Sequence, residues 1–253
     1  MSLPTLILIP GAYTPHTIYN DFLPLLRAHN IEAYALPLQT VGRRPLPAPH
    51  MYDDAAFIAT EVRKLVDLGK RVVLLGHSYG GVPISQCTEG LSVKERAAEG
   101  KKGGVARLVY LTALVPRPGE TASGEEPGDL AGAGYLSHYL SFDPELALRF
   151  TLSDIPREKA LSLGNISQEM SAVSQVDALT WAGYKDVPST YIVTKQDQAL
   201  SVDRQQVAIE VLKEFAPDEG GPEILEIDSG HAPNLSKPEE LAKMLKDIVE
   251  RAK

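Results

Sequence analysis

Two patterns of apolar residues alternate along the chain. The first consists of short apolar runs, rich in Val, Ile, Leu, Tyr and Thr and bounded by turn residues, which is typical of strands buried on both faces of a parallel sheet. The clear runs, and the weaker one at Ile31–Leu36, predict six strands at Thr5–Ile9, Ile31–Leu36, Val72–Leu75, Leu108–Leu114, Thr190–Val193 and Ile224–Ile227.

The second pattern is helical and falls between these runs. Met51–Leu68 carries one apolar stripe at three- and four-residue spacing, and Gly69 follows it as a C-terminal stop. Asp203–Phe215 and Pro238–Ala252 show the same spacing. Strands that alternate with crossover helices predict an α/β fold with an open, doubly wound, mostly parallel sheet.

One long stretch interrupts this alternation. No strand is expected from Pro116 to Val187, and a structureless loop of that length is uncommon in a compact domain. We therefore predict a helical cap at 116–187, inserted before the penultimate strand of a core formed by 1–115 and 188–253, within a single structural domain. Helices are expected near Asp143–Thr151, Pro156–Leu163 and Gln168–Ala182.

The cap is expected to begin with a mobile loop. Gly119–Gly134 contains five glycines and four acidic residues, with almost no apolar side chain larger than alanine to bury. We predict that this loop gates the functional site.

Composition narrows the classes of function. The 253 residues are 43% apolar and 23% charged, and the only cysteine, Cys87, excludes disulfides within the chain and cysteine-based zinc sites. A net charge of −8 without blocks of like charge argues against a nucleic-acid partner, and no apolar run approaches a membrane span. We expect a cytoplasmic protein with a small-molecule substrate and no membrane partner. The sequence is compatible with either a monomer or a homodimer.

The candidate nucleophile is Ser78. Gly76-His77-Ser78-Tyr79-Gly80 has the form Gly-x-Ser-x-Gly, follows a predicted strand and precedes a helix that begins near Gly81. This strand–turn–helix setting is that of a nucleophile elbow, where side chains at the flanking positions would clash with neighbouring elements. A glycine-rich turn without a catalytic role is the alternative interpretation.

A serine nucleophile needs a base, and His231 is the candidate among six histidines. It alone follows the last strand directly, in a loop that leaves the carboxyl edge of the sheet beside the elbow. His77 is expected to point away from the serine. His29 and His50 are expected on the surface. His16 and His138 could line a pocket, but a structural role is preferred for each.

Two acidic residues compete to orient His231. Asp197 lies three residues past the strand that ends near Thr194, and it precedes a helix. Glu120 follows another strand, but it starts the glycine-rich loop, so we favour Asp197. The chain order Ser78, Asp197, His231 is that of the α/β-hydrolase triad.

Backbone N–H groups are expected to form an oxyanion hole near the serine. The N–H of Tyr79, the residue after the nucleophile, is one candidate donor. The second is the N–H of Ala12 in the loop after the first strand, where Gly11 allows a close approach.

These motifs together resemble a known family. Pro10-Gly11-Ala12, the elbow, the segment Tyr191–Asp197 and Gly230-His231 are similar to those of small α/β-hydrolases, a group that includes plant methyl-ester esterases, hydroxynitrile lyases and their bacterial and fungal relatives. The resemblance covers nearly the whole chain and implies the α/β-hydrolase fold with a serine triad. Hydroxynitrile lyases have a threonine in place of Gly11 and a lysine soon after the histidine. Ala232 and Pro233 stand there in this chain, which favours hydrolysis.

The residues and the resemblance lead to one first hypothesis. The chain is expected to hydrolyse a carboxylic ester or lactone through an acyl-enzyme, without a metal or organic cofactor. The alternatives are a lyase or C–C bond-cleaving enzyme on the same triad, and a non-catalytic small-molecule receptor. The expected pocket is largely apolar, with lining candidates Tyr13, His16, Tyr135, Leu136, Tyr139 and Trp181. Arg43 and Arg44 could meet an acidic substrate, but a solvated pair is preferred.

Overall fold

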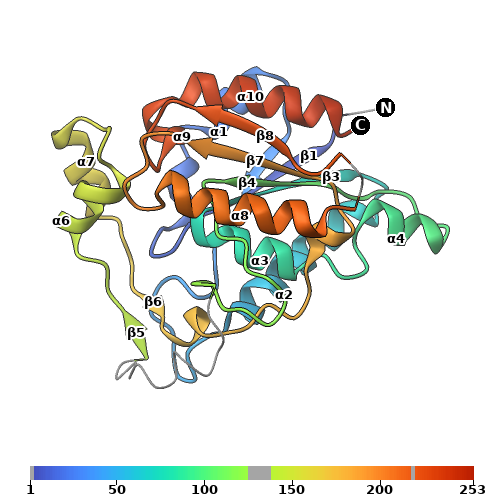
Figure 1. Ribbon diagram of the computed structural model, residues 1–253, viewed down its shortest axis with the longest axis horizontal. Coiled ribbons are helices and arrows are strands. Elements are labelled where there is room, and N and C mark those ends of the chain that lie inside the picture. Colours follow the sequence, from blue (N-terminus) through green and yellow to red (C-terminus); the bar gives the residue numbers. More distant parts are fainter. Residues whose placement is uncertain (1–2, 125–137, 218–219) are drawn as a thin grey trace.

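A six-stranded parallel sheet forms the centre of the chain in the computed structural model, which describes residues 3–124, 138–217 and 220–253 (Figure 1). The strand order is β2-β1-β3-β4-β7-β8. The bounds are β1 Thr5–Ile9, β2 Ala33–Ala35, β3 Arg71–His77, β4 Gly104–Leu111, β7 Ser189–Thr194 and β8 Glu223–Ile227. All six predicted strands are confirmed, although β4 begins and ends earlier than its apolar run.

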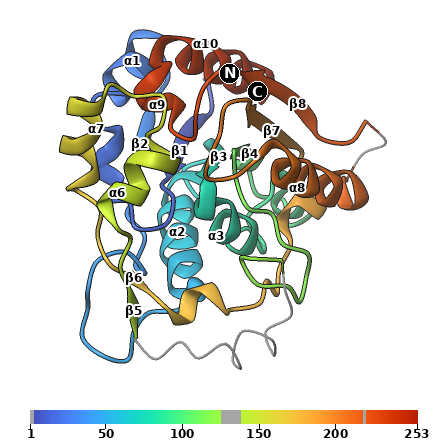
Figure 2. The ribbon, with the colours of Figure 1, turned by 60° about the vertical axis from the view of Figure 1, so that its left-hand side comes forward.

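Helices cover both faces of this sheet. Alternate strand residues point to opposite faces, so Leu74 belongs to one apolar cluster and its neighbours Val73 and Leu75 to the other. The first cluster packs against α2 (Met51–Val66), α3 (Gly81–Gln86) and α8 (Val202–Phe215). The second packs against α1 (Leu23–Ala28) and α10 (Pro238–Arg251). Figures 1 and 2 show the resulting three layers, which confirm the doubly wound α/β architecture.

Two shorter helices complete the core. Helix α4 (Val93–Ala98) begins with a capping box, in which Ser92 accepts from the N–H of Glu95 and the Glu95 carboxylate accepts from the N–H of Ser92. Helix α9 (Pro233–Ser236) lies between β8 and α10 and follows His231 almost directly.

The segment between β4 and β7 is only partly helical. Helix α6 (Pro144–Leu146) continues into a π-helical turn at Ala147–Thr151, and α7 spans Arg157–Gly164, so two of the three expected helices are confirmed. The prediction of no strand in this segment is wrong, because β5 (Tyr139–Leu140) and β6 (Met170–Ser171) form an antiparallel pair.

The third expected helix, Gln168–Ala182, does not form. Its first residues hydrogen-bond to the loop after β2 instead: the N–H of Ser171 donates to the carbonyl of Thr40, and the carbonyl of Glu169 accepts from Gly42, both at 2.8 Å. Only a single 3₁₀ turn, Val173–Gln175, follows. These tertiary hydrogen bonds override the helical spacing of the apolar residues.

Most of the predicted gating loop, from residue 125 to 134, lies outside the described residues. Its described beginning is packed against the chain, since Gly119 donates a backbone hydrogen bond to Leu179 and Leu179 donates one to Glu120. Thr121 and Ala122 are buried. The gating motion stays a prediction.

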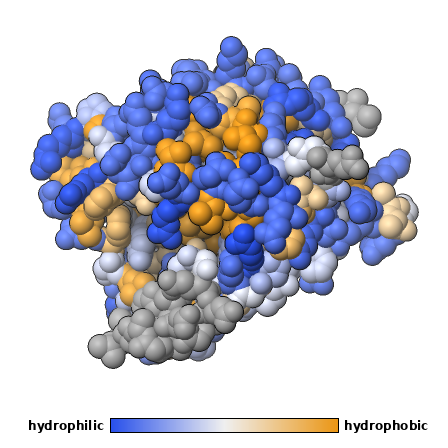
Figure 3. All heavy atoms as spheres, in the orientation of Figure 1, coloured by the Kyte–Doolittle hydropathy of each residue, from blue (hydrophilic) through white to orange (hydrophobic). Residues whose placement is uncertain are grey.

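The surface carries both polar and apolar areas. On the face of Figure 3, α10 is largely hydrophilic, and an apolar area lies over β8 and α8, where Val202, Val207 and Ile224 are exposed. Within the three described ranges, no helix is both long and apolar enough to cross a bilayer.

A buried carboxylate fixes the loop after β2 to helix α2. Asp54, in the first turn of α2, is fully buried and accepts hydrogen bonds from the N–H groups of Gln39 and Thr40 and from the hydroxyls of Thr40 and Tyr79. Burial raises the pKa of Asp54 to about 7, although these donors favour the charged form.

This raised pKa makes the stability of the fold depend on pH. The folded state holds the Asp54 proton up to about pH 7, whereas the unfolded state releases it near pH 4, so the contribution of Asp54 falls as pH rises between these values. The Asp54→Asn variant cannot titrate there. Urea unfolding of both proteins from pH 4.5 to 8 measures this effect. As the pH rises toward 7, the unfolding free energy of the wild type should fall relative to that of the variant, by up to about 1.4 kcal/mol per pH unit. A pH-independent difference would contradict this expectation.

Candidate active site

Ser78 sits on a strained turn at the carboxyl end of β3. Its φ is 55°, in the left-handed region that side chains rarely adopt, and the chain continues through a 3₁₀ turn into α3. A Cβ on Gly76 would lie 2.5 Å from the carbonyl oxygen of Gly80, and one on Gly80 would lie 2.6 Å from that of Pro10. The glycine spacing therefore follows from close backbone packing. Strain of this kind at a non-glycine residue is typical of functional sites.

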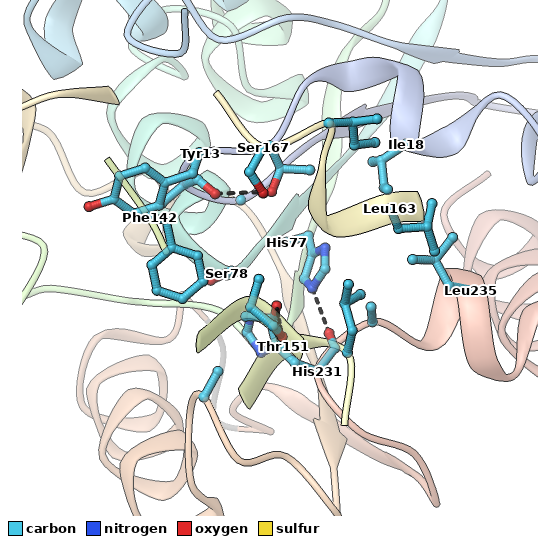
Figure 4. A pocket seen from close by; sticks show the side chains of 18 of the residues that line it. Tyr13, Ile18, His77, Ser78, Phe142, Thr151, Leu163, Ser167, His231 and Leu235 are labelled. Atoms are coloured by element: carbon cyan, nitrogen blue, oxygen red, sulfur yellow. Dashed lines mark hydrogen bonds between the residues drawn. The ribbon is translucent and has the colours of Figure 1, made fainter. Parts of the chain in front are cut away.

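Ser78 opens onto a partly open, mostly apolar cavity of about 200 Å³ (Figure 4). Its walls come from the loop after β1, from the segment between β4 and β7, and from the region after β8. The side chains from these three regions include Tyr13 and Ile18, then Phe142, Thr151 and Leu163, then His231 and Leu235.

His231 reaches this cavity from the loop after β8 and is paired with Asp197. The distance from His231 Nδ1 to Asp197 Oδ2 is 2.7 Å, and both residues are buried. Since Asp197 accepts the Nδ1 proton, the other ring nitrogen, Nε2, is left as a proton acceptor. Ser78 and His231 thus line one cavity and Asp197 contacts the histidine, each residue coming from just after a different strand end.

Asp197 is held by a dense set of hydrogen-bond donors. Its Oδ2 atom also accepts from the hydroxyls of Thr112 and Thr194, and its Oδ1 atom accepts from the N–H groups of Ala199 and Leu200. Burial alone would raise the pKa of Asp197, but His231 and these donors lower it to about 2. The carboxylate therefore stays charged and cannot turn away from His231.

Glu120, the competing acid, lies elsewhere. Its carboxylate accepts a hydrogen bond from the N–H of Arg117 at 2.8 Å and lines a different pocket, between the chain after β4 and α8. Asp197, and not Glu120, is therefore the acid that contacts His231.

His77 does not point away from the site, contrary to the expectation from sequence. Its Nε2–H donates to the backbone carbonyl of His231 at 2.7 Å, its Nδ1 lies 3.3 Å from the hydroxyl of Tyr19, and its ring centre is 5.0 Å from that of His231. Burial lowers the pKa of His77 to about 3, so the ring is neutral and donates from one nitrogen only. The pattern Gly-x-Ser-x-Gly does not specify the residue type at this position, so the motif alone did not predict the contact.

A second contact holds the His231 loop to the segment between β4 and β7. The N–H of Gly230 donates to the carboxylate of Asp154 at 2.6 Å, and a Cβ on Gly230 would overlap that carboxylate. Leu152 and Ile155 form a small apolar cluster with Ala232. Residues 152–155 therefore tie the segment between β4 and β7 to the histidine loop, and no sequence pattern marked Asp154 for this position.

The oxyanion candidates lie beside the serine. Ala12 lines the cavity, and a Cβ on Gly11 would lie 3.0 Å from the Cβ of Ser78, so this loop passes close to the nucleophile. The backbone of Tyr79 follows Ser78 at the start of the turn, while its buried side chain points to Asp54.

The pocket candidates separate into four groups. Tyr13 lines the cavity and stacks on Phe142 with ring centres 5.3 Å apart, a partner that the sequence did not single out. Tyr139 and Trp181 are not among its lining residues: the Tyr139 hydroxyl bonds to the backbone of Arg44, and the backbone N–H of Trp181 donates to the side-chain carbonyl of Gln86. His16 lines a neighbouring chamber, and Tyr135 and Leu136 lie outside the described residues.

Comparison with known proteins identifies the family. The model of the alpha/beta hydrolase family matches residues 6–244. The chain belongs to this family. The probable hydrolase R7 of the fungus Phoma sp. is 35% identical to this hydrolase, over 98% of this chain and 99% of that protein.

Two plant proteins confirm the resemblance found in the motifs. The alpha-hydroxynitrile lyase of Arabidopsis thaliana is 23% identical, over 96% of this hydrolase and 95% of the plant protein. The crystal structure of an Arabidopsis methylesterase aligns with a TM-score of 0.74 at 20% identity, over 98% of this hydrolase and 99% of that chain. The latter likeness shows that the α/β-hydrolase fold is shared.

Among the described residues of this hydrolase, no group of three or more His, Cys, Asp or Glu side chains is arranged to hold a metal ion. The polar groups at the cavity are the neutral His77, whose Nε2–H donates to the carbonyl of His231, and His231 itself, whose Nδ1–H donates to the carboxylate of Asp197. This arrangement suits proton transfer at a serine.

The hydrogen bond from His77 to His231 should contribute to stability. His77→Phe leaves the buried carbonyl of His231 without a donor, which should cost about 1–3 kcal/mol of unfolding free energy. His77→Gln keeps an N–H donor and should lose less. Urea unfolding measures both, with Tyr19→Phe as the control for the weaker contact on the other ring nitrogen. Equal losses for the Phe and Gln variants would contradict this role.

Proposed function

We propose that this protein is a serine hydrolase that cleaves a carboxylic ester or lactone of a small, largely apolar molecule. The observation that carries the proposal is the meeting of a strained serine, Ser78, with the buried pair His231–Asp197 at one apolar cavity. A hydrolase relative at 35% identity and the shared fold of a methylesterase support it.

In the proposed mechanism, Ser78 Oγ attacks the ester carbonyl and its proton passes to His231 Nε2. Asp197 holds the imidazole by Nδ1 and stabilises its charged form. The N–H groups of Ala12 and Tyr79 stabilise the oxyanion of the tetrahedral intermediate. His231 then returns the proton to the leaving alcohol, which yields an acyl-enzyme. Water attacks this ester with the help of His231, releasing the acid and restoring Ser78.

The segment between β4 and β7 is the proposed lid. Phe142, Thr151, Leu152 and Leu163 from this segment line the cavity, so substrate entry requires either an opening beside them or their displacement. The cavity is smaller than the roughly 300–1,000 Å³ of sites for drug-sized ligands. It therefore suits one short apolar part of the substrate, such as the acyl group.

Hydrolysis is favoured over the lyase alternative by the charges at the cavity. No lysine or arginine is among its lining residues in the described chain, so no cation is present to stabilise a cyanide leaving group. Ala232 and Pro233, which follow His231, are also uncharged. A receptor function would need no activated serine, and labelling by a fluorophosphonate probe separates the receptor from the enzyme.

Replacement of the nucleophile is the direct test. Ser78→Ala should fold normally and lose roughly 10⁴-fold or more in kcat on p-nitrophenyl esters, because the three residues act as a unit. The wild type should also be labelled by a fluorophosphonate probe, and the variant should not. Comparable ester turnover by folded Ser78→Ala would remove the nucleophile assignment.

The acid is tested by a matched pair of amide variants. Asp197→Asn should lose roughly 10³–10⁴-fold in kcat, because the amide favours the wrong imidazole tautomer. Glu120→Gln should change kcat by less than about tenfold, since its carboxylate contacts Arg117. Steady-state kinetics on one ester, with circular dichroism as the folding control, decides between them. The opposite order of losses would assign the acid to Glu120.

A further inference from the structure

A second chamber adjoins the cavity at Ser78. Its volume is about 590 Å³, and it is more open to solvent than the inner cavity. Thr14, Pro15, Ile166 and Ser167 line both spaces, so two short stretches of chain form the partition between them. A substrate held at Ser78 that extends past this partition enters the second chamber.

The second chamber differs from the inner cavity in its charge. Its described lining residues include Arg44 and His16, together with neutral polar and apolar residues, and they include no aspartate or glutamate. The chain as a whole has 33 acidic and 25 basic residues. The local charge therefore favours an anion although the protein as a whole is acidic.

Arg44 is positioned by hydrogen bonds that leave its terminal nitrogens available. Its Nε donates to the carbonyl of Gln39 at 2.8 Å. The hydroxyl of Tyr139 accepts from the Arg44 N–H at 3.0 Å and donates to the Arg44 carbonyl at 3.1 Å. Among the described residues, no carboxylate lies within ion-pair distance of this guanidinium.

The adjacent Arg43 provides an internal comparison. Its Nε and Nη2 atoms donate to the two carboxylate oxygens of Glu169 at 2.7 and 2.8 Å, so its charge is already compensated. Arg43 is also absent from the lining of the second chamber in the described chain. Two consecutive arginines therefore have different roles: Arg43 ties the loop to Glu169, and Arg44 lines the chamber.

We propose that the second chamber binds a carboxylate of the substrate through Arg44, so that the preferred substrates are monoesters of dicarboxylic acids. The proposal rests on the ester hydrolysis proposed above. The ester lies at Ser78, an apolar spacer crosses the partition, and the terminal carboxylate meets the guanidinium, whose planar donors match it. His16 adds a second donor to the same chamber.

A series of p-nitrophenyl esters tests this proposal. Each ester of an ω-carboxyalkanoic acid, with two to eight methylene groups, is paired with the methyl-terminated ester of the same length. At the spacer length that spans the partition, wild-type kcat/KM should be about tenfold higher for the carboxylate ester, and this preference should decrease with salt. Arg44→Gln should remove the preference, so that kcat/KM falls about tenfold for the carboxylate ester and much less for the neutral ester.

Arg43→Gln is the matched control and should keep the preference. Neutral ester hydrolysis without a carboxylate preference at any length, or a preference that survives in Arg44→Gln, would overturn the second-chamber proposal and leave the proposed hydrolysis intact. If no ester is hydrolysed by the wild type, the proposed function fails. Calorimetric titration with suberate and adipate then tests the chamber alone: weaker binding by Arg44→Gln than by Arg43→Gln supports it, and equal binding overturns it.

Discussion

A buried carboxylate must be surrounded by hydrogen-bond donors, and the structure around Asp197 meets that requirement. Donors reach it from the end of β4 at Thr112, from β7 at Thr194, from its own loop at Ala199 and Leu200, and from His231 after β8. Thr112 adopts a positive φ of 37° at this point. The carboxylate thus connects three neighbouring strand ends, and the orientation of His231 follows from their arrangement.

The same strand ends explain why the sequence was informative. Parallel strands place their carboxyl ends at one edge of the sheet, so residues just after an apolar run are brought together without any knowledge of the side-chain packing. Ser78, Asp197 and His231 all follow such runs. His77 lies inside β3, where alternation predicts only a face, and its contact with the His231 carbonyl depends on the neighbouring loop. Tyr139 and Trp181 were misplaced because their positions depend on how the 138–187 region folds over the core.

There is a physical reason why the sequence predicted only part of the 138–187 region. Its helices α6 and α7 have local capping and spacing signals, such as Asp143, which accepts from the N–H of Glu145. The part from Gln168 to Ala182 is shaped by hydrogen bonds to the loop after β2 and to Tyr13, whose carbonyl accepts from the N–H of Gln168. Partners more than a hundred residues away leave no periodic pattern in the segment itself.

The distribution of charge links the fold to substrate choice. Around Ser78 the protein keeps one permanent charge, on Asp197, because burial holds His77 neutral and the other walls are mostly apolar. An additional charge close to the triad would perturb the proton transfer between Ser78 and His231. A cation that recognises the substrate is therefore best placed beyond the partition, in the more open chamber, where water reduces its effect on the imidazole. Arg44 occupies such a position, and the hydroxyl of Tyr139 holds it there from the segment that also covers the cavity.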